Sequence, residues 1–193
     1  MSTLILNGSL NKTGDTESLL KIARENLIGD VIEINPYFDG LFPCIGCKIC
    51  NKNGSCHLKD KLTPLLDLET NLINEINNVI VASPVRISGL TGSMMSMAER
   101  FQLWYVREHL LKLEPKINIK HGGIILVGGG HGSELRAISQ AKHILENLRA
   151  NILQQDIITS LKTDILPASE DEIAKENVRR LVLEMNQNKT RVT

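Results

Sequence analysis

The amino-acid sequence predicts an α/β fold in which a doubly wound, five-stranded parallel sheet is covered by helices on both faces. Short apolar, β-branched runs alternate with amphipathic stretches along the 193-residue chain, which is the pattern of β-α units. The apolar runs are nearly continuous, as in parallel strands that are buried on both faces. The chain length is close to that of one average domain, so we expect a single domain over residues 1–193.

The expected elements follow one another in regular alternation. The strands are expected at residues 3–7, 30–34, 78–83, 123–127 and 152–158, and the helices at residues 16–27, 61–76, 94–111, 134–150 and 170–187. A sheet of this size fits the flavodoxin-like strand order 2-1-3-4-5. In such a sheet, ligands bind beyond the carboxyl ends of the strands.

The charges exclude several classes of function. Lys and Arg together number 22 and Asp and Glu together number 22, so the net charge is zero. Such a chain lacks the positive field that attracts nucleic acid or anionic lipid, and we expect neither as a partner. No apolar run approaches the ~20 residues that a membrane span requires. Residues 1–9 also lack the basic segment of a signal peptide, so we expect a cytoplasmic protein.

All four cysteines lie in one stretch after the second expected strand, at Cys44, Cys47, Cys50 and Cys56. The surrounding residues are rich in Gly and Pro and have no helical period, so we expect an inserted cysteine loop at about residues 40–60. In a reducing cytosol, grouped cysteines are more often metal ligands or redox groups than disulfides. This spacing can surround an iron–sulfur cluster. Four thiolates also suit a zinc ion, although zinc ligands usually form two separated pairs.

Three further loops are rich in small residues and follow the first, third and fourth strands. Their candidate ligand-binding residues are Ser9, Asn11, Thr13, Gly14, Asp15 and Thr16, then Pro84, Val85, Arg86, Ile87, Ser88 and Gly89, and last Gly128, Gly129 and Gly130. Backbone N–H groups and hydroxyls before a helix can hold a phosphate, and glycines let a backbone approach a flat ligand. Turns and helix caps use the same residue types. The fingerprints of dinucleotide-binding and P-loop proteins are absent.

These loops resemble those of the NADPH-dependent FMN reductase family of flavodoxin-like proteins. The resemblance runs over roughly residues 3–150 and rests on Gly8-Ser9 with Thr13-Gly14-Asp15-Thr16, Ser83-Pro84-Val85 with Gly92 and Glu99-Arg100, and the loop at 128–134. With the cysteines added, the sequence resembles the iron–sulfur flavoproteins of that family. The resemblance implies that the first loop binds the FMN phosphate, that residues 84–89 wrap the isoalloxazine ring, and that the third loop covers its other flank.

The same resemblance implies a [4Fe-4S] cluster on the four cysteines and a flavin-dependent oxidoreductase. Electrons would come from a ferredoxin-like donor or NAD(P)H and leave to a small-molecule acceptor, in a homodimer or homotetramer. The chemistry takes place on FMN, so no side chain need act as an acid or base. Cluster-free reductases can carry related cysteines, which leaves zinc and the absence of a metal open. The alternatives are therefore a cluster-free NAD(P)H-dependent FMN or quinone reductase and a non-enzymatic redox carrier or sensor.

Several positions depart from the family pattern or stand outside it. Asp15 adds a negative charge to the phosphate loop unless its carboxylate points away. Arg86 replaces an aromatic residue near the flavin, where a fixed guanidinium would favour the anionic reduced flavin; an ordinary ion pair is the plainer interpretation. His57 and His131 are interpreted as loop residues, and Trp104 and Tyr105 as buried anchors.

Overall fold

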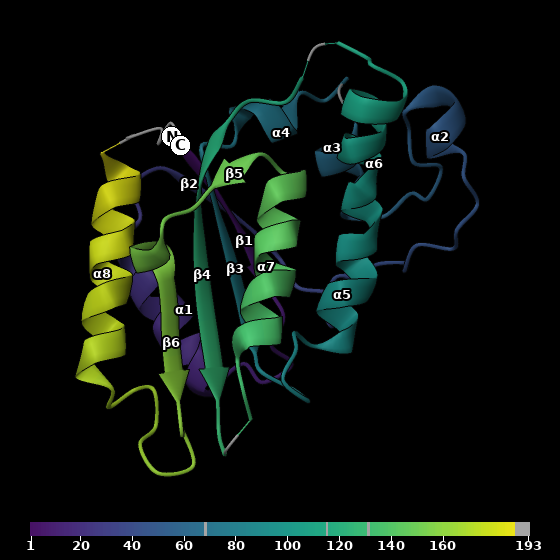
Figure 1. Cartoon of the computed structure of the whole chain (residues 1–193). Coiled ribbons are helices and arrows are strands. Elements are labelled where there is room, and N and C mark those ends of the chain that lie inside the picture. The colour runs from purple at the N-terminus through teal and green to yellow at the C-terminus, as the bar shows by residue number, and fades with distance from the viewer. Residues whose placement is uncertain (68, 115, 131, 188–193) are drawn as a thin grey trace.

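The computed structural model describes residues 1–67, 69–114, 116–130 and 132–187 and contains one parallel sheet between two layers of helices (Figure 1). The strands are β1 (Ser2–Asn7), β2 (Asp30–Ile34), β3 (Asn78–Pro84), β4 (Lys120–Gly128), β5 (Ala150–Asn151) and β6 (Ile157–Leu161). The α-helices are α1 (Asp15–Asn26), α2 (Cys50–Asn53), α3 (Thr63–Leu66), α4 (Leu72–Glu75), α5 (Gly92–Ala98), α6 (Gln102–Tyr105), α7 (Leu135–Asn147) and α8 (Glu172–Asn186). Two 3-10 helices, η1 (Glu99–Phe101) and η3 (Gln154–Asp156), and a π-helix, η2 (Val106–Leu110), complete the described elements. None of these helices is long and apolar enough to cross a membrane.

The strands confirm the flavodoxin-like order. They pair in parallel as β2-β1-β3-β4, and both β5 and β6 pair with β4. The expected fifth strand at residues 152–158 is wrong in its position, because the chain forms the short β5 before it and β6 mostly after it. Asp156 explains the break, since its carboxylate accepts a hydrogen bond from the Leu153 N–H at 2.8 Å and closes the turn of η3.

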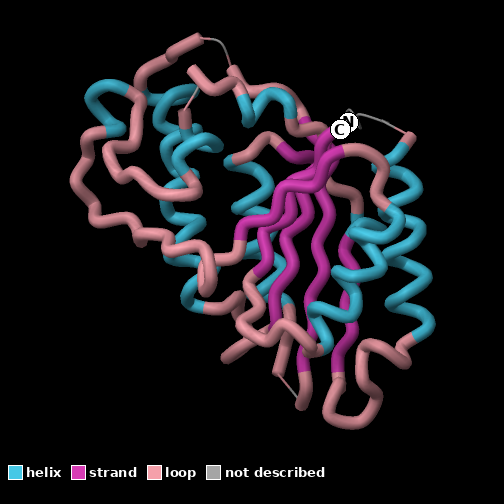
Figure 2. The backbone as a smooth tube through the Cα atoms, turned by 180° about the vertical axis from the view of Figure 1, so that it is seen from behind, coloured by secondary structure: helices cyan, strands magenta, loops and turns pink. Residues whose placement is uncertain are grey.

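The core forms on both faces of the sheet because successive side chains of a strand point to opposite faces. In β1, Leu4 and Leu6 pack in a buried cluster with Phe101, on the side covered by α5, α6 and α7. Ile5 packs on the other face with Leu19 of α1 and residues of α8. Figure 2 shows the strands as one layer, with a loop-rich segment projecting from one side. Because helices cover both faces of the sheet, the loops at the strand ends are the segments that remain available to form a binding site.

Two expected helices are irregular. The helix expected at residues 61–76 is wrong, because the chain forms only the one-turn helices α3 and α4. Asp67 is extended and Asn71 has a left-handed φ of 54°, and both conformations end a helix. The helix expected at residues 94–111 is formed by α5, η1, α6 and η2 in succession. Its start is fixed by Thr91, whose side chain accepts a hydrogen bond from the Met94 N–H at 3.4 Å.

A glycine sets the distance between the sheet and α8. A Cβ on Gly123, in the middle of β4, would lie 2.6 Å from Leu181 Cδ2 and 3.1 Å from Met185 Cε, both on α8. A glycine inside a strand commonly marks such a close approach. A side chain at residue 123 would therefore force the ends of the Leu181 and Met185 side chains to move within the buried core.

We expect the substitution Gly123→Ala to lower the free energy of unfolding by about 1–3 kcal/mol, because overpacking displaces neighbouring side chains or backbone. Urea unfolding of the full chain followed by circular dichroism measures it. Gly92→Ala is the control, because a Cβ there meets no atom within 4 Å and should change the stability by less than about 0.5 kcal/mol. Equal effects of the two substitutions would contradict the packing argument.

Candidate functional site

An open cleft of about 710 Å³ lies at the carboxyl ends of β1, β3 and β4, where the sequence predicts a ligand. Its volume is within the range of small-molecule and cofactor sites. Ten of the residues expected to bind the cofactor line it, namely Ser9, Asn11, Gly14, Asp15, Thr16, Pro84, Val85, Arg86, Gly128 and Gly129. The remaining five, Thr13, Ile87, Ser88, Gly89 and Gly130, do not line it.

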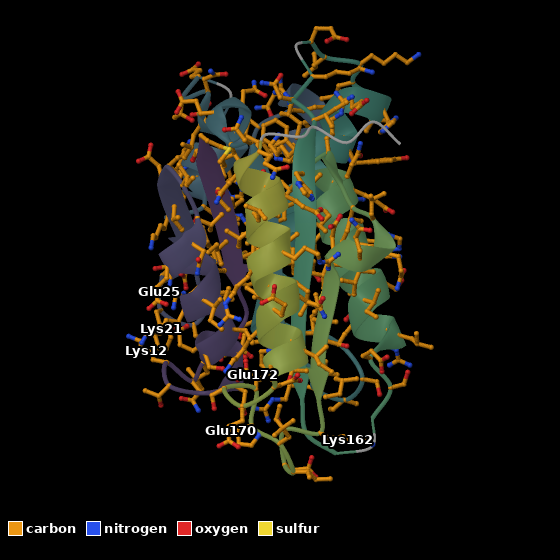
Figure 3. All side chains as sticks on the ribbon, turned by 90° about the vertical axis from the view of Figure 1, so that its left-hand side faces the viewer. Lys12, Lys21, Glu25, Lys162, Glu170 and Glu172 are labelled. Carbon is orange, nitrogen blue, oxygen red and sulfur yellow. The ribbon has the colours of Figure 1, made fainter. Side chains whose placement is uncertain are left out.

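The first loop is held by hydrogen bonds among its own polar residues. The Ser9 N–H donates to Asn7 Oδ1 at 3.0 Å, and the Asn11 N–H donates to Ser9 Oγ at 3.2 Å. Thr13 donates both its N–H and its hydroxyl to Asn11 Oδ1, which accounts for its place outside the cleft. Lys12 lies over the Phe38 ring at 4.1 Å, at the end of the molecule where the strands end (Figure 3). These internal hydrogen bonds fix the conformation of the loop.

Asp15 directs a carboxylate oxygen toward a backbone donor outside the first loop. Its Oδ1 accepts a hydrogen bond from the N–H of Ala168, which precedes α8 and is fully buried. This contact links the start of α1 to the segment after β6. One oxygen of the carboxylate is therefore occupied by the protein, while Asp15 still lines the cleft.

The second loop folds into a tight turn at its tip. Arg86 and Gly89 exchange backbone hydrogen bonds of 2.8 and 3.0 Å, and the two residues between them, Ile87 and Ser88, both have a positive φ. Two-residue hairpin turns with a positive φ at both positions normally use Asn and Gly, so a β-branched residue here is strained. Ile87 is 94% exposed. The turn leaves Pro84, Val85 and Arg86 in the cleft and projects Ile87 into solvent.

The third loop completes the cleft together with the segments that follow β2 and β6. The Gly130 N–H donates to Asp164 Oδ1 at 3.1 Å, which ties this loop to the segment after β6. His131 lies outside the described residues. Sequence reasoning missed six lining residues, namely Leu10, Tyr37, Thr91, Gly92, Val127 and Thr163. Most of them also follow strand ends, so the strand order was the signal that could have found them.

The four cysteines line a second, separate pocket of about 210 Å³ beside α2 and the start of α6. Cys47 is exposed and the other three are partly buried, and all four are free thiols. Burial raises the pKa of the Cys50 thiol, and the neighbouring sulfurs of Cys44 and Cys47 raise it further. In the described part of the chain, no three of the four cysteine Sγ atoms all lie within 4.8 Å of one another.

Several side chains approach the sulfur atoms. Gln102 Nε2 lies 3.3 Å from Cys44 Sγ, and a guanidinium nitrogen of Arg100 lies 3.9 Å from Cys56 Sγ. His57, interpreted from the sequence as a loop residue, is exposed but lies with Nδ1 3.3 Å from Cys47 Sγ. These groups can donate N–H hydrogen bonds to thiolate sulfur. They can therefore stabilise negative charge on Cys44, Cys47 and Cys56, whereas burial opposes it on Cys50.

Arg100 also anchors the cysteine loop. Its guanidinium pairs with the Asp60 carboxylate, and both side chains are almost fully buried. Arg100 further donates to the carbonyls of Phe42 and Leu58, on either side of the cysteines. Burial alone would raise the pKa of Asp60, but hydrogen bonds from Arg100 and from the Phe42 N–H, together with the Arg100 charge, lower it. One buried cation thus holds both ends of the loop.

The chain is similar to known proteins over most of its length. Residues 1–163 match the family model of NADPH-dependent FMN reductase. An iron-sulfur flavoprotein of Methanocaldococcus jannaschii is 26% identical over 146 residues, covering 72% of this chain and 69% of the relative. An iron-sulfur flavoprotein of Archaeoglobus fulgidus is 26% identical over 149 residues, covering 76% of this chain and 63% of the relative. The chain thus spans about two thirds of the length of these relatives.

The fold is also found among solved structures. RosB with bound 8-demethyl-8-formylriboflavin-5'-phosphate superposes with a TM-score of 0.64 at 14% identity, covering 97% of this chain and 78% of RosB. Such a likeness at low identity shows a shared fold.

We expect Arg100→Met to lower the free energy of unfolding at pH 7 by about 3–5 kcal/mol, because it leaves the Asp60 carboxylate buried without its partner. The lowered pKa of Asp60 stabilises the wild type above the ordinary Asp value, near 4, and that contribution is lost as the pH falls through the folded-state value. The difference between the two proteins should therefore shrink below about pH 4. Urea unfolding at pH 7 and pH 3.5 measures it.

The control for this prediction is Arg179→Met, which removes an arginine that is 45% exposed and pairs with Glu176 on the surface. It should cost less than about 1 kcal/mol at either pH. A loss in Arg100→Met that is the same at pH 7 and pH 3.5 would show that the ion pair is not its cause.

Proposed function

Because the chain belongs to the NADPH-dependent FMN reductase family, we propose that it is an FMN-dependent oxidoreductase that also holds a [4Fe-4S] cluster on Cys44, Cys47, Cys50 and Cys56. FMN transfers electrons singly or in pairs, and a cluster of this kind transfers them one at a time. The protein would bind both groups, fix their positions and set their reduction potentials. Electrons would pass from NAD(P)H or a ferredoxin-like donor to a small acceptor.

The observation that carries the flavin part is the cleft at the strand ends. It brings together residues of three loops that are far apart in the sequence, and both small polar residues and the apolar Pro84 and Val85 line it. Ser9, Gly14 and Thr16 lie before and at the start of α1, where backbone N–H groups and the helix dipole favour a phosphate. Flat apolar surface beside a phosphate site suits FMN.

Four thiolates suit either metal group, but the spacing of the sulfurs supports a cluster rather than zinc. A zinc ion with four sulfurs at about 2.3 Å would bring those sulfurs to about 3.8 Å from one another. The four thiols are spread more widely around their pocket. A cluster of four irons separates its ligands further than one ion does, so the wider arrangement fits it. The curated relatives named as iron-sulfur flavoproteins support the same assignment.

We further propose that the protein forms a homodimer or homotetramer that covers the flavin cleft. Exposed apolar side chains stand at the loops around the strand ends, with Leu10 60%, Ile87 94%, Leu135 69% and Ile165 75% exposed. Exposed apolar groups gathered in one region mark interaction sites. Size-exclusion chromatography with light scattering tests the proposal, and a monomer at all concentrations would refute it.

We expect anaerobically purified protein to contain FMN with about four irons and four acid-labile sulfides per chain. Cys50→Ser should remove more than half of the iron and sulfide and leave the FMN content unchanged, because the two pockets are separate. The control Lys52→Gln, within α2 but outside the pocket lining, should change neither. Metal and sulfide analysis with absorption spectra measures both groups.

The outcomes also separate the alternatives. Zinc in place of iron, or FMN without any metal, would overturn the cluster and leave a cluster-free flavin or quinone reductase. Protein that holds both groups but shows no steady-state turnover with NADH or NADPH and an acceptor would instead be a redox carrier or sensor.

We expect Arg86→Gln to lower the two-electron midpoint potential of bound FMN, because the Arg86 guanidinium lines the cleft and stabilises negative charge on the reduced flavin. Each 1 kcal/mol of stabilisation lost corresponds to about 20 mV. Spectroelectrochemical titration measures the shift. Arg179→Gln, on the distant surface of α8, is the control, and an unchanged potential in Arg86→Gln would remove this role.

A further inference from the structure

A third pocket lies at the opposite end of the sheet from the flavin cleft. It has a volume of about 190 Å³ and is built by α6, the π-helix η2, the segment before β4 and the end of α7. We call it the π-helix pocket and define it by Trp104, Arg107, Glu108, Lys116, Glu146 and Arg149. In Figure 1 the carboxyl-terminal end of α7 lies at the end of the molecule away from the strand arrowheads. Neither the flavin cleft nor the cysteine pocket shares these residues.

Two guanidinium groups in this pocket bind backbone carbonyls. Arg107 donates to the Gly54 carbonyl at 2.8 Å and lies over the Trp104 ring, and Arg149 donates to the Ile117 carbonyl at 3.0 Å. Within the described part of the chain, neither arginine forms an ion pair with Asp or Glu. A guanidinium has five N–H donors, so both retain donors for a ligand.

The carboxylates of the pocket are occupied elsewhere. Glu108 pairs with Lys116 at 3.0 Å, and this hydrogen bond and the Arg149 charge lower its pKa. Glu146 is largely exposed and binds His143 at 2.8 Å. These two carboxylates therefore pair with Lys116 and His143, and neither is within ion-pair distance of Arg107 or Arg149.

A buried lysine next to Arg149 adds a further positive charge to this region. Lys120 begins β4 and is fully buried, with its Nζ donating to the Asn118 carbonyl at 2.6 Å. Burial, and then the positive charge of Arg149, lower the pKa of Lys120 to about 8. A bound anion near Arg149 would offset this repulsion.

The backbone is unusual at the same place. The residues of η2, including Arg107 and Glu108, form a π-helix, and the Leu111 N–H donates to the Val106 carbonyl five residues earlier. Single π-turns within α-helices are rare and occur frequently at functional sites. This wider turn carries Arg107 into the wall of the pocket.

We propose that the π-helix pocket binds the anionic group of a small metabolite, a phosphate or a carboxylate, held between Arg107 and Arg149. Planar guanidinium groups bind both anions in a bidentate manner, which favours arginine at such sites. The pocket is smaller than the 300–1,000 Å³ typical of drug-sized ligands, so the ligand is small. This site is independent of the proposed flavin and cluster chemistry.

Calorimetric titration of the FMN-saturated full chain with inorganic phosphate, and separately with succinate, tests the proposal at constant ionic strength set by chloride. Saturation with FMN keeps the phosphate from occupying the flavin cleft. We expect one saturable site and at least a tenfold weaker affinity in Arg149→Gln. The control Lys142→Gln removes one charge from α7 outside the pocket lining and should keep the affinity.

A second variant guards against loss of folding. Lys116 is 46% exposed at the rim, so Lys116→Gln should fold normally and weaken binding by a smaller factor. Binding of phosphate alone, succinate alone or both supports the site and identifies the anion. Absence of saturable binding of either anion, or equal weakening in Arg149→Gln and Lys142→Gln, would overturn it. If FMN does not bind, the titration is repeated on the apoprotein. The difference in affinity between Arg149→Gln and Lys142→Gln still tests this pocket, because both variants keep the flavin cleft unchanged.

Discussion

The parallel register of β1, β3 and β4 is the constraint on which the flavin cleft depends. Asn7 lies opposite Ala82, and Pro84 lies opposite Val127, so three chain segments leave the sheet at one edge. The ladder continues one residue into the loops, because the Gly8 N–H donates to the Ala82 carbonyl at 2.8 Å and the Val85 N–H to the Val127 carbonyl at 2.7 Å. Each loop therefore starts from a fixed backbone, and small residues can form a cleft without a rigid framework of their own.

The cysteine loop has no such support from the sheet, and a buried ion pair anchors it together with the Arg107 hydrogen bond to Gly54. Between β2 and α3 its described regular structure is the single turn of α2, which packs no buried residue. Arg100 fixes the two ends of the loop there, because its guanidinium binds Asp60 and the carbonyls of Phe42 and Leu58. A buried pair adds little net stability compared with apolar packing, but removing one partner is costly. The pair therefore specifies where the loop sits beside η1 and α6.

The sequence predicted what depends on hydrophobic period and missed what depends on single contacts. The strand order and the ten lining residues followed from the alternation of apolar runs and from the rule that parallel strands end at one edge. The turn at Leu153, the break at Asn71 and the strained turn at Ile87 each depend on a local hydrogen bond or a positive φ. Tyr105, expected to be buried, is 59% exposed because Leu103 and Trp104 are the buried residues of its one-turn helix and Tyr105 lies beyond them toward solvent. Such contacts have no periodic signature.

One irregular helical segment, from Gly92 to Leu110, connects all three pockets. Gly92 lines the flavin cleft, Arg100 and Gln102 line the cysteine pocket, and Arg107 lines the π-helix pocket. At about 1.5 Å per residue, the ten steps from Gly92 to Gln102 span about 15 Å. In a uniform α-helix, each residue would be rotated about the helix axis by the same angle from the one before it. The changes of winding fall at η1, which carries Arg100, and at η2, which carries Arg107. The irregular turns therefore redirect the two arginines that the second and third pockets require, at the cost of regular hydrogen bonding in that segment.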